Sequence, residues 1–176
     1  MELWMSDHQD GRIFHPDGDQ RCRTVLDPEA HMQHMLHELV DVPDDCSVAS
    51  LHAAYLSELA RRIESMGIET ITAETDIDNE TLEAITSQDA VDLRVLEAAK
   101  ILAVDDKYPD ADTIAAVSRD ALLLSMSNAV VDVETLSSEL DGELEPREIQ
   151  SKVEGRFPMT IREFALLYGH LQCKIQ

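Results

Sequence analysis

Apolar residues recur at intervals of three and four through most of the chain after residue 35. Over Val48–Met66 they form a single stripe, which predicts an amphipathic helix that ends at Gly67. Similar spacings predict helices over 68–75, 79–86, 93–103, 112–129, 133–140, 147–154 and 161–171. The alternation of apolar and polar positions that is typical of strands is nowhere sustained. The sequence therefore predicts an all-α fold.

Two residues are well placed to begin helices. Asp78 and Thr160 directly precede predicted helices, and a side-chain oxygen there can accept hydrogen bonds from the unpaired amides of the first turn. Residues 1–34 differ from the rest, since they contain scattered Asp, Gly and His and show neither a helical nor a strand period. We expect this segment to be a flexible leader.

The two halves of the remaining chain match at nearly constant offsets of 65 to 68 residues. Such self-similarity indicates two copies of one supersecondary unit. We therefore expect a first unit at 35–106 and a second at 107–176, with the helix at 112–129 joining the two copies. The matched residues are Glu69-Thr70-Ile71 with Glu134-Thr135-Leu136, Leu82 and Ile85 with Ile149 and Val153, and Leu93 and Leu96 with Ile161 and Phe164.

Each unit resembles the helix-turn-helix of the Cro/C1-repressor type. In the first unit, Ile71, Ile77 and Leu82 stand where that motif has the apolar residues that lock its two helices together. Asp76 replaces the usual Gly, and Asp tolerates the left-handed φ of that position. In the second unit, the run from Glu148 to Phe164 looks like a recognition helix, its exit and the capped helix that follows. The turn before that run is longer than in the first unit.

Acidic residues dominate the surface chemistry. The 176 residues include 36 Asp and Glu against 14 Lys and Arg, which gives a formal net charge of -22, and only four of the basic residues are Lys. From Met35 onward the chain is similar to a family of small acidic haloarchaeal proteins of unknown function, a resemblance that implies no activity. In molar salt the Debye length is about 3 Å, so repulsion between carboxylates is screened. We expect a halophilic cytoplasmic protein, and an acidic mesophilic protein is the alternative.

The second unit carries the candidate nucleic-acid contacts. Its recognition helix would present Arg147, Gln150, Ser151, Lys152 and Arg156, whose side chains can donate hydrogen bonds to base edges and phosphates. The segment from 146 to 176 is also the only sizeable part of the chain that is not acidic. The first hypothesis is therefore a sequence-specific DNA-binding regulator that uses the second unit.

The equivalent face of the first unit predicts a packing role instead. It presents Asn79, Glu80, Glu83 and Thr86, and the two carboxylates would repel phosphate. The second hypothesis follows from this face, namely an interaction or homodimerisation module that recruits another protein or itself without nucleic acid. Exposure of Arg147, Lys152 and Arg156 on one convex surface would favour DNA binding, and their placement beneath carboxylates would not.

Other classes of function find little support. The glycines are isolated and no hydrolase or metalloprotease motif occurs, so we expect no enzyme, no cofactor and no small-molecule ligand. His31, His34 and His37 lack a spacing that completes a zinc site, so we expect no metal. No apolar run approaches the roughly 18 residues of a membrane span. The three cysteines are far apart, which favours free thiols.

Overall fold

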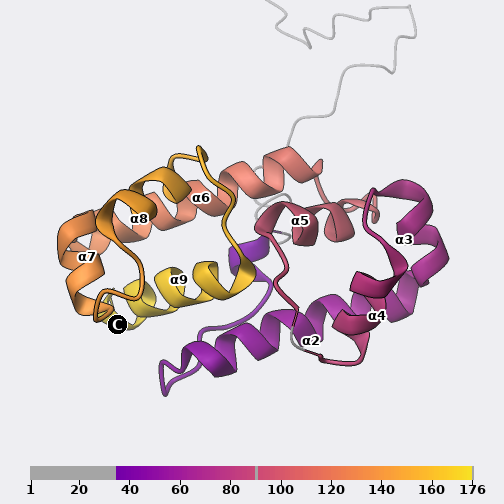
Figure 1. The fold of residues 1–176 in the computed structure, drawn as a ribbon, viewed down its shortest axis with the longest axis horizontal. Helices are drawn as coiled ribbons and strands as arrows, with labels where there is room; N and C mark the ends of the chain where they lie inside the picture. Colours follow the sequence, from indigo (N-terminus) through magenta and orange to yellow (C-terminus); the bar gives the residue numbers. More distant parts are fainter. Residues whose placement is uncertain (1–34, 90, 176) are drawn as a thin grey trace, which may run out of the picture.

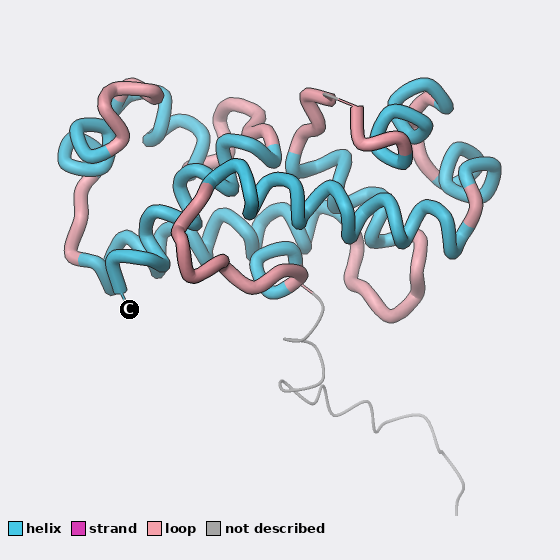
Figure 2. Tube along the Cα trace, turned by 90° about the horizontal axis from the view of Figure 1, so that it is seen from below, coloured by secondary structure: helices cyan, strands magenta, loops and turns pink. Residues whose placement is uncertain are grey.

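The computed structural model describes residues 35–89 and 91–175, and the named elements in this part of the chain are all helices. Figure 2 shows helices joined by loops, with no strand drawn over the described residues. The all-α fold is therefore confirmed. The elements are a short 3-10 helix, η1 (Leu36–Glu38), and the α-helices α2 (Val48–Met66), α3 (Ile68–Glu74), α4 (Asn79–Thr86), α5 (Val95–Ala103), α6 (Ala111–Ala129), α7 (Val133–Glu139), α8 (Pro146–Val153) and α9 (Ile161–Ile175).

Local capping chemistry explains why these boundaries lie close to the predicted ones. Asp78 accepts from the N–H of Thr81 at 2.8 Å and begins α4. Thr160 and Glu163 form a reciprocal capping box at the start of α9, in which the N–H of Glu163 donates to the Thr160 hydroxyl and the Thr160 N–H donates to the Glu163 carboxylate. Gly67 ends α2 with φ of 89°. The expected flexible leader at 1–34 lies outside the described residues.

The helices fall into two series of similar length. Helices α2, α3 and α4 have 19, 7 and 8 residues, and α6, α7 and α8 also have 19, 7 and 8. In Figure 1 the long helices α2 and α6 lie along opposite sides, with α5 and α9 between them. The pair α3–α4 lies at one end and α7–α8 at the other.

The starts of α5 and α9 meet at the centre of the molecule. Arg94 and Thr160 form an isolated antiparallel β-bridge, in which the Val95 N–H donates to the Met159 carbonyl at 2.8 Å and the Ile161 N–H donates to the Leu93 carbonyl at 2.8 Å. Because Leu93 and Arg94 are extended here, α5 begins two residues later than the predicted position 93. The bridge ties the two series together, and α2 packs on α9 while α5 packs on α6.

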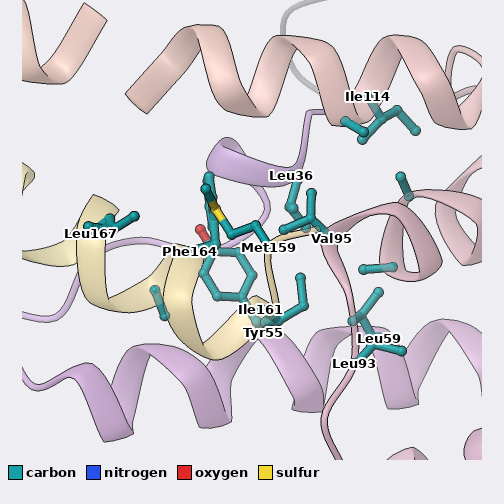
Figure 3. Close-up of a cluster of buried hydrophobic side chains, with 14 of the residues drawn as sticks. Leu36, Tyr55, Leu59, Leu93, Val95, Ile114, Met159, Ile161, Phe164 and Leu167 are labelled. Carbon is teal, nitrogen blue, oxygen red and sulfur yellow. The ribbon is translucent and has the colours of Figure 1, made fainter. Parts of the chain in front are cut away.

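A single apolar core runs through this junction. Figure 3 shows side chains from η1, α2, α5, α6 and α9 converging there, including Leu36, Tyr55 and Phe164. Tyr55 packs edge-on against Phe164 with ring centroids 5.9 Å apart, and Phe164 stacks on Tyr168 at 5.4 Å. In a chain with only 4% aromatic residues, such pairs add about 0.5–1.5 kcal/mol each beyond the apolar area that they bury.

A disulfide corrects the expectation of free thiols. Cys46, just before α2, is bonded to Cys173 near the end of α9, with their Cα atoms 6.0 Å apart. The two residues are 127 positions apart in sequence, so their spacing gave no sign of the pairing. They meet because α9 packs along α2, which brings the end of one helix to the start of the other (Figure 1). Cys22 lies outside the described residues.

Candidate functional site at the connection between α8 and α9

A helix forms close to the predicted range 147–154, and its ends are well defined. Helix α8 has Pro146 at its first position, where the missing N–H costs no hydrogen bond. It ends before Gly155, whose φ of 73° belongs to the left-handed region that favours glycine. The chain then runs through Phe157 and Pro158 to the capped start of α9.

Lys152 does not lie on the exposed face of this helix, contrary to the expectation from the sequence. Its side chain is buried, with 8% of the residue exposed, and its ammonium donates to both carboxylate oxygens of Glu163 at 2.8 and 2.9 Å. The same ammonium donates to the Pro158 carbonyl at 3.1 Å and lies 3.4 Å from Glu148. Lys152 therefore holds α8 to the start of α9.

The position of Lys152 in its helix explains this burial. It is the seventh residue of α8, and the seventh residue of α4 is the fully buried Ile85. Lys152 also follows Ile149 by three positions, so the two side chains share the apolar face. Burial by itself would lower the pKa of Lys152, but the hydrogen bonds and charges of Glu163 and Glu148 outweigh it and raise the pKa.

The other four candidate residues lie at or near the surface, and most are engaged locally. Arg147, Gln150 and Arg156 are exposed and Ser151 is half-buried. Glu154 accepts a hydrogen bond from Gln150 at 3.1 Å and forms an ion pair with Arg156. The Ser151 hydroxyl donates to the Arg147 carbonyl at 2.8 Å. Among the described residues, no carboxylate forms an ion pair with Arg147.

An apolar feature that the sequence interpretation did not single out lies beside these residues. Phe157 is 64% exposed, although large apolar side chains are buried elsewhere in most of the described chain. With Pro158 it lines an open groove of about 440 Å³ along α8, together with Glu145, Arg147, Glu148, Ser151 and Lys152. The only sequence signal for this groove was an aromatic residue between two predicted helices.

A second cavity lies on the other side of the same connection. Its volume is about 350 Å³, and four basic side chains line it, namely Arg94, Arg119, Lys152 and Arg156. The sequence analysis missed Arg94 and Arg119 because they belong to different segments, the start of α5 and the middle of α6. Only the packing of α5, α6, α8 and α9 brings them together.

The first helix pair has an acidic outer face. Asn79, Glu80 and Glu83 are exposed, and the Thr72 hydroxyl donates to the Asn79 side chain at 2.6 Å. Asp76 does not adopt the left-handed φ expected of it, and its carboxylate forms an ion pair with Lys100 of α5 at 2.5 Å. This ion pair fixes the turn between α3 and α4 to the following helix.

Neither a metal cluster nor a single membrane-spanning helix is found in the described part of the chain. Within 35–89 and 91–175, no three His, Cys, Asp or Glu side chains are grouped to hold an ion. His37 is half-buried against Tyr168, while His31 and His34 lie outside the described residues. No single described helix is long and apolar enough to cross a bilayer, although α6 and α7 pass the same test as a pair bent by 86°.

Comparison with known proteins places this chain among proteins whose activity is not known. No curated protein and no solved structure matches it. A model of a family of unknown function, DUF5791, matches residues 51–174, which include all of α3 to α8 and most of α2 and α9. The match covers well over half of the chain, and the protein therefore belongs to the DUF5791 family of unknown function.

Proposed function

We propose that this protein is a non-enzymatic interaction module that docks another protein at the connection between α8 and α9. The exposure of Phe157 carries the proposal, because it places a large aromatic side chain in water beside Pro158 and the groove along α8. Arg156, directly before it, is also exposed. Aromatic residues and Arg are the types that most often supply binding energy at the centre of protein interfaces.

The chemistry of this surface specifies the partner. Phe157 fits an apolar pocket, and the exposed Arg147, which forms no ion pair with a carboxylate of the described residues, favours a carboxylate at the rim of that pocket. The proposed partner is a different protein with an apolar pocket that carries a carboxylate at its rim.

A DNA-binding regulator that uses Arg147, Gln150, Ser151 and Arg156 is the competing proposal. The exposure of Arg147 and Arg156 supports it. The engagement of Lys152 by Glu163 speaks against it, because that ammonium is not free to meet a phosphate. Glu148 and Glu154 on the same short helix would also repel the DNA backbone.

The proposal treats the two halves as copies of one helix-turn-helix-like unit used for packing. Two observations support the duplication, namely the equal lengths of α2–α4 and α6–α8 and the antiparallel bridge between Arg94 and Thr160. An antiparallel bridge between the residues that directly precede α5 and α9 is what a two-fold relation between copies produces. We also propose that the acidic surface is an adaptation to molar salt. In such salt, the burial of Phe157 in the partner would supply most of the affinity.

Parallel selections of displayed peptides and of random DNA duplexes, both in molar KCl, test the proposal. We expect enriched peptides that bind the wild type and lose binding with Phe157→Ser. Leu124→Ser is the matched control, because Leu124 is 62% exposed on α6 and lies away from the groove residues. Binding to the control variant should equal binding to the wild type.

The selection of DNA duplexes is checked with the variants Gln150→Ala and Arg147→Glu, because both residues are exposed and Lys152 is not. An enriched duplex whose binding is lost in these variants but kept in Phe157→Ser would replace the interaction module with a DNA regulator. Failure of every peptide to distinguish Phe157→Ser from Leu124→Ser would reject the docking surface.

A further inference from the structure

The 350 Å³ cavity between α5, α6 and the α8–α9 connection concentrates positive charge in an acidic molecule. Arg94, Arg119, Lys152 and Arg156 are four of the 14 basic residues of the whole chain, and Asp112 is the only acidic residue among those that line the cavity. With 36 acidic residues in the chain, carboxylates are common enough to pair with every basic residue of such a cluster. The local excess of arginine therefore needs an explanation.

Among the described residues, two of these cations have no acidic partner. Lys152 is neutralised by Glu163 and Glu148, and Arg156 by Glu154. Within the described part of the chain, no carboxylate lies within ion-pair distance of Arg94 or Arg119. An arginine presents five N–H donors in a planar fork that suits carboxylate and phosphate oxygens. Arg94 and Arg119 both line the cavity, and neither guanidinium is engaged by a carboxylate of the described residues.

The side chain of Arg119 lies against the backbone of Gly155. Gly155 has φ of 73°, and a Cβ built on it would lie only 3.0 Å from Nε and 3.2 Å from Cζ of Arg119. The guanidinium therefore rests against the glycine backbone, where no larger residue fits without moving it.

Apart from Asp112 and Ser118, the remaining side chains that line the cavity are apolar. Val95, Ala115, Met159 and Phe164 are buried at the cavity, and the half-exposed Leu96 and Phe157 lie at its rim. A volume of about 350 Å³ lies within the usual range of about 300–1,000 Å³ for small-molecule sites. Apolar walls with a few converging polar groups are also typical of such sites.

We infer that this cavity is a binding site for a small organic anion, in which a carboxylate or phosphate group meets Arg94 and Arg119 and an apolar body packs on Met159 and Phe164. The inference does not depend on the proposed docking of a partner at Phe157. It differs from the expectation from the sequence, which implied no small-molecule ligand.

Titrations of the ¹⁵N-labelled full chain with benzoate and with phenyl phosphate test the site and distinguish its two anion classes. We expect saturable shifts of the Gly155 and Leu96 amide signals with at least one probe at constant KCl. Inorganic phosphate and benzyl alcohol each carry half of the proposed ligand and should bind at least about tenfold more weakly, since each lacks one set of contacts.

Substitutions of single residues distinguish binding in the cavity from a general electrostatic attraction of the anion to the protein. Arg94→Gln and Arg119→Gln should each raise the dissociation constant about tenfold or more, because a charge-assisted hydrogen bond is lost. Arg61→Gln removes the same charge from the exposed surface of α2 and should leave binding unchanged. Leu96→Glu, at the rim, should weaken binding without altering the core, and this variant covers the case in which Arg119→Gln unfolds the chain.

Three results would overturn the inference. They are the absence of saturable shifts with both probes, equal weakening by Arg61→Gln and Arg119→Gln, and inorganic phosphate binding as tightly as phenyl phosphate. Loss of anion binding in Arg94→Gln with peptide docking retained would show that the anion site and the docking surface act separately, because Arg94 lines the cavity and not the groove.

Discussion

Val130 adopts a backbone conformation that valine normally avoids. It caps the C-terminus of α6 with φ of 54° and ψ of 49°, in the left-handed region, and is 90% exposed. A β-branched residue is a clear outlier there, and Gly67 occupies the corresponding place at the end of α2. The left-handed conformation costs an L-residue about 1–2 kcal/mol. Burial does not compensate for this cost.

Replacing this valine should therefore stabilise the fold. We expect Val130→Gly to raise the free energy of unfolding by about 1 kcal/mol, since the relief of left-handed strain exceeds the entropy that glycine adds to the unfolded chain. Val130→Ala is the control, because alanine keeps the Cβ that causes the strain. Urea denaturation measures both variants, and a glycine variant no more stable than the alanine variant would contradict this account.

Lys152 illustrates a different conflict at the same scale, between a charged residue and a position on an apolar helix face. Its ion pair with Glu163 compensates for burial, and Glu163 also accepts from the N–H of Thr160. Removal of the lysine would strand a carboxylate that is 20% exposed, so the penalty should be smaller than the 3–5 kcal/mol typical of a fully buried pair.

We expect Lys152→Ala to lower the free energy of unfolding by about 2 kcal/mol. The double variant Lys152→Met with Glu163→Gln should recover to within about 1 kcal/mol of the wild type, because it removes both charges and Gln still suits the capping box. Urea denaturation of the single and double variants checks this. A double variant less stable than Lys152→Ala would show that the charge pair itself is required.

At the scale of elements, three helices begin with the same four-residue pattern. Asp78, Asp110 and Asp132 each accept from the N–H of the threonine three positions later, at 2.8, 3.0 and 2.8 Å. The backbone N–H and hydroxyl of Thr81 lower the pKa of Asp78. The hydroxyls and N–H groups of Thr113 and Thr135 do the same for Asp110 and Asp132.

This pattern predicts a pH dependence of stability with a definite sign. Since each folded pKa lies below the usual value near 4, the caps stabilise the fold above that pH and lose their effect as the pH falls through the folded values. The triple variant Asp78→Asn, Asp110→Asn and Asp132→Asn keeps good N-caps that do not titrate. The thermal midpoint in high salt should therefore fall less between neutral pH and about pH 3 in the triple variant than in the wild type. Equal falls of the midpoint in both proteins would show that titration of the three caps does not cause the pH dependence.

At the scale of the whole molecule, the Cys46–Cys173 disulfide closes a loop that spans nearly the entire described chain. In the chain-entropy description, a cross-link of about 100 residues stabilises the folded state by about 4.7 kcal/mol. Reduction, or the variant Cys46→Ser with Cys173→Ser, should lower the free energy of unfolding by about 4 kcal/mol.

Thiol titration of the denatured, unreduced protein should detect Cys22 alone. Detection of all three thiols would contradict the cross-link.

The acidic surface predicts a strong dependence on salt. With a net charge of -22, carboxylates repel one another across the surface, and the Debye length falls from about 10 Å at 0.1 M salt to about 3 Å at 1 M. We expect the thermal midpoint to rise steeply over this range and to rise equally with KCl and NaCl, because screening does not distinguish the cations. An unchanged midpoint would favour the acidic mesophilic alternative.

Much of the fold could be predicted from the sequence because helices are specified by local rules. The stripe in α2, the cap at Asp78 and the glycine at position 67 depend on neighbours a few residues apart, and the predicted bounds of α2 and α4 agree with the structure. Helix α9 extends beyond its predicted end at 171 because contacts distant in sequence prolong it. Gln172 donates to the Ser125 hydroxyl at 2.9 Å, and Cys173 is bonded to Cys46.

The candidate site was much less predictable. The sequence placed Lys152 on an exposed helix face from its charge, whereas the structure buries it because Glu163, eleven residues later, can meet its ammonium. The arginine-lined cavity draws on α5, α6 and the α8–α9 connection, so no local pattern could reveal it.

The sequence by itself therefore determined the helices, their caps and the acidic surface, since each depends on residue type and short-range spacing. The tertiary structure alone decided which charges are neutralised, which cysteines are bonded and which apolar side chains stay in water. Those outcomes depend on contacts between distant segments, namely the bridge of Arg94 with Thr160, the ion pair of Lys152 with Glu163 and the exposure of Phe157.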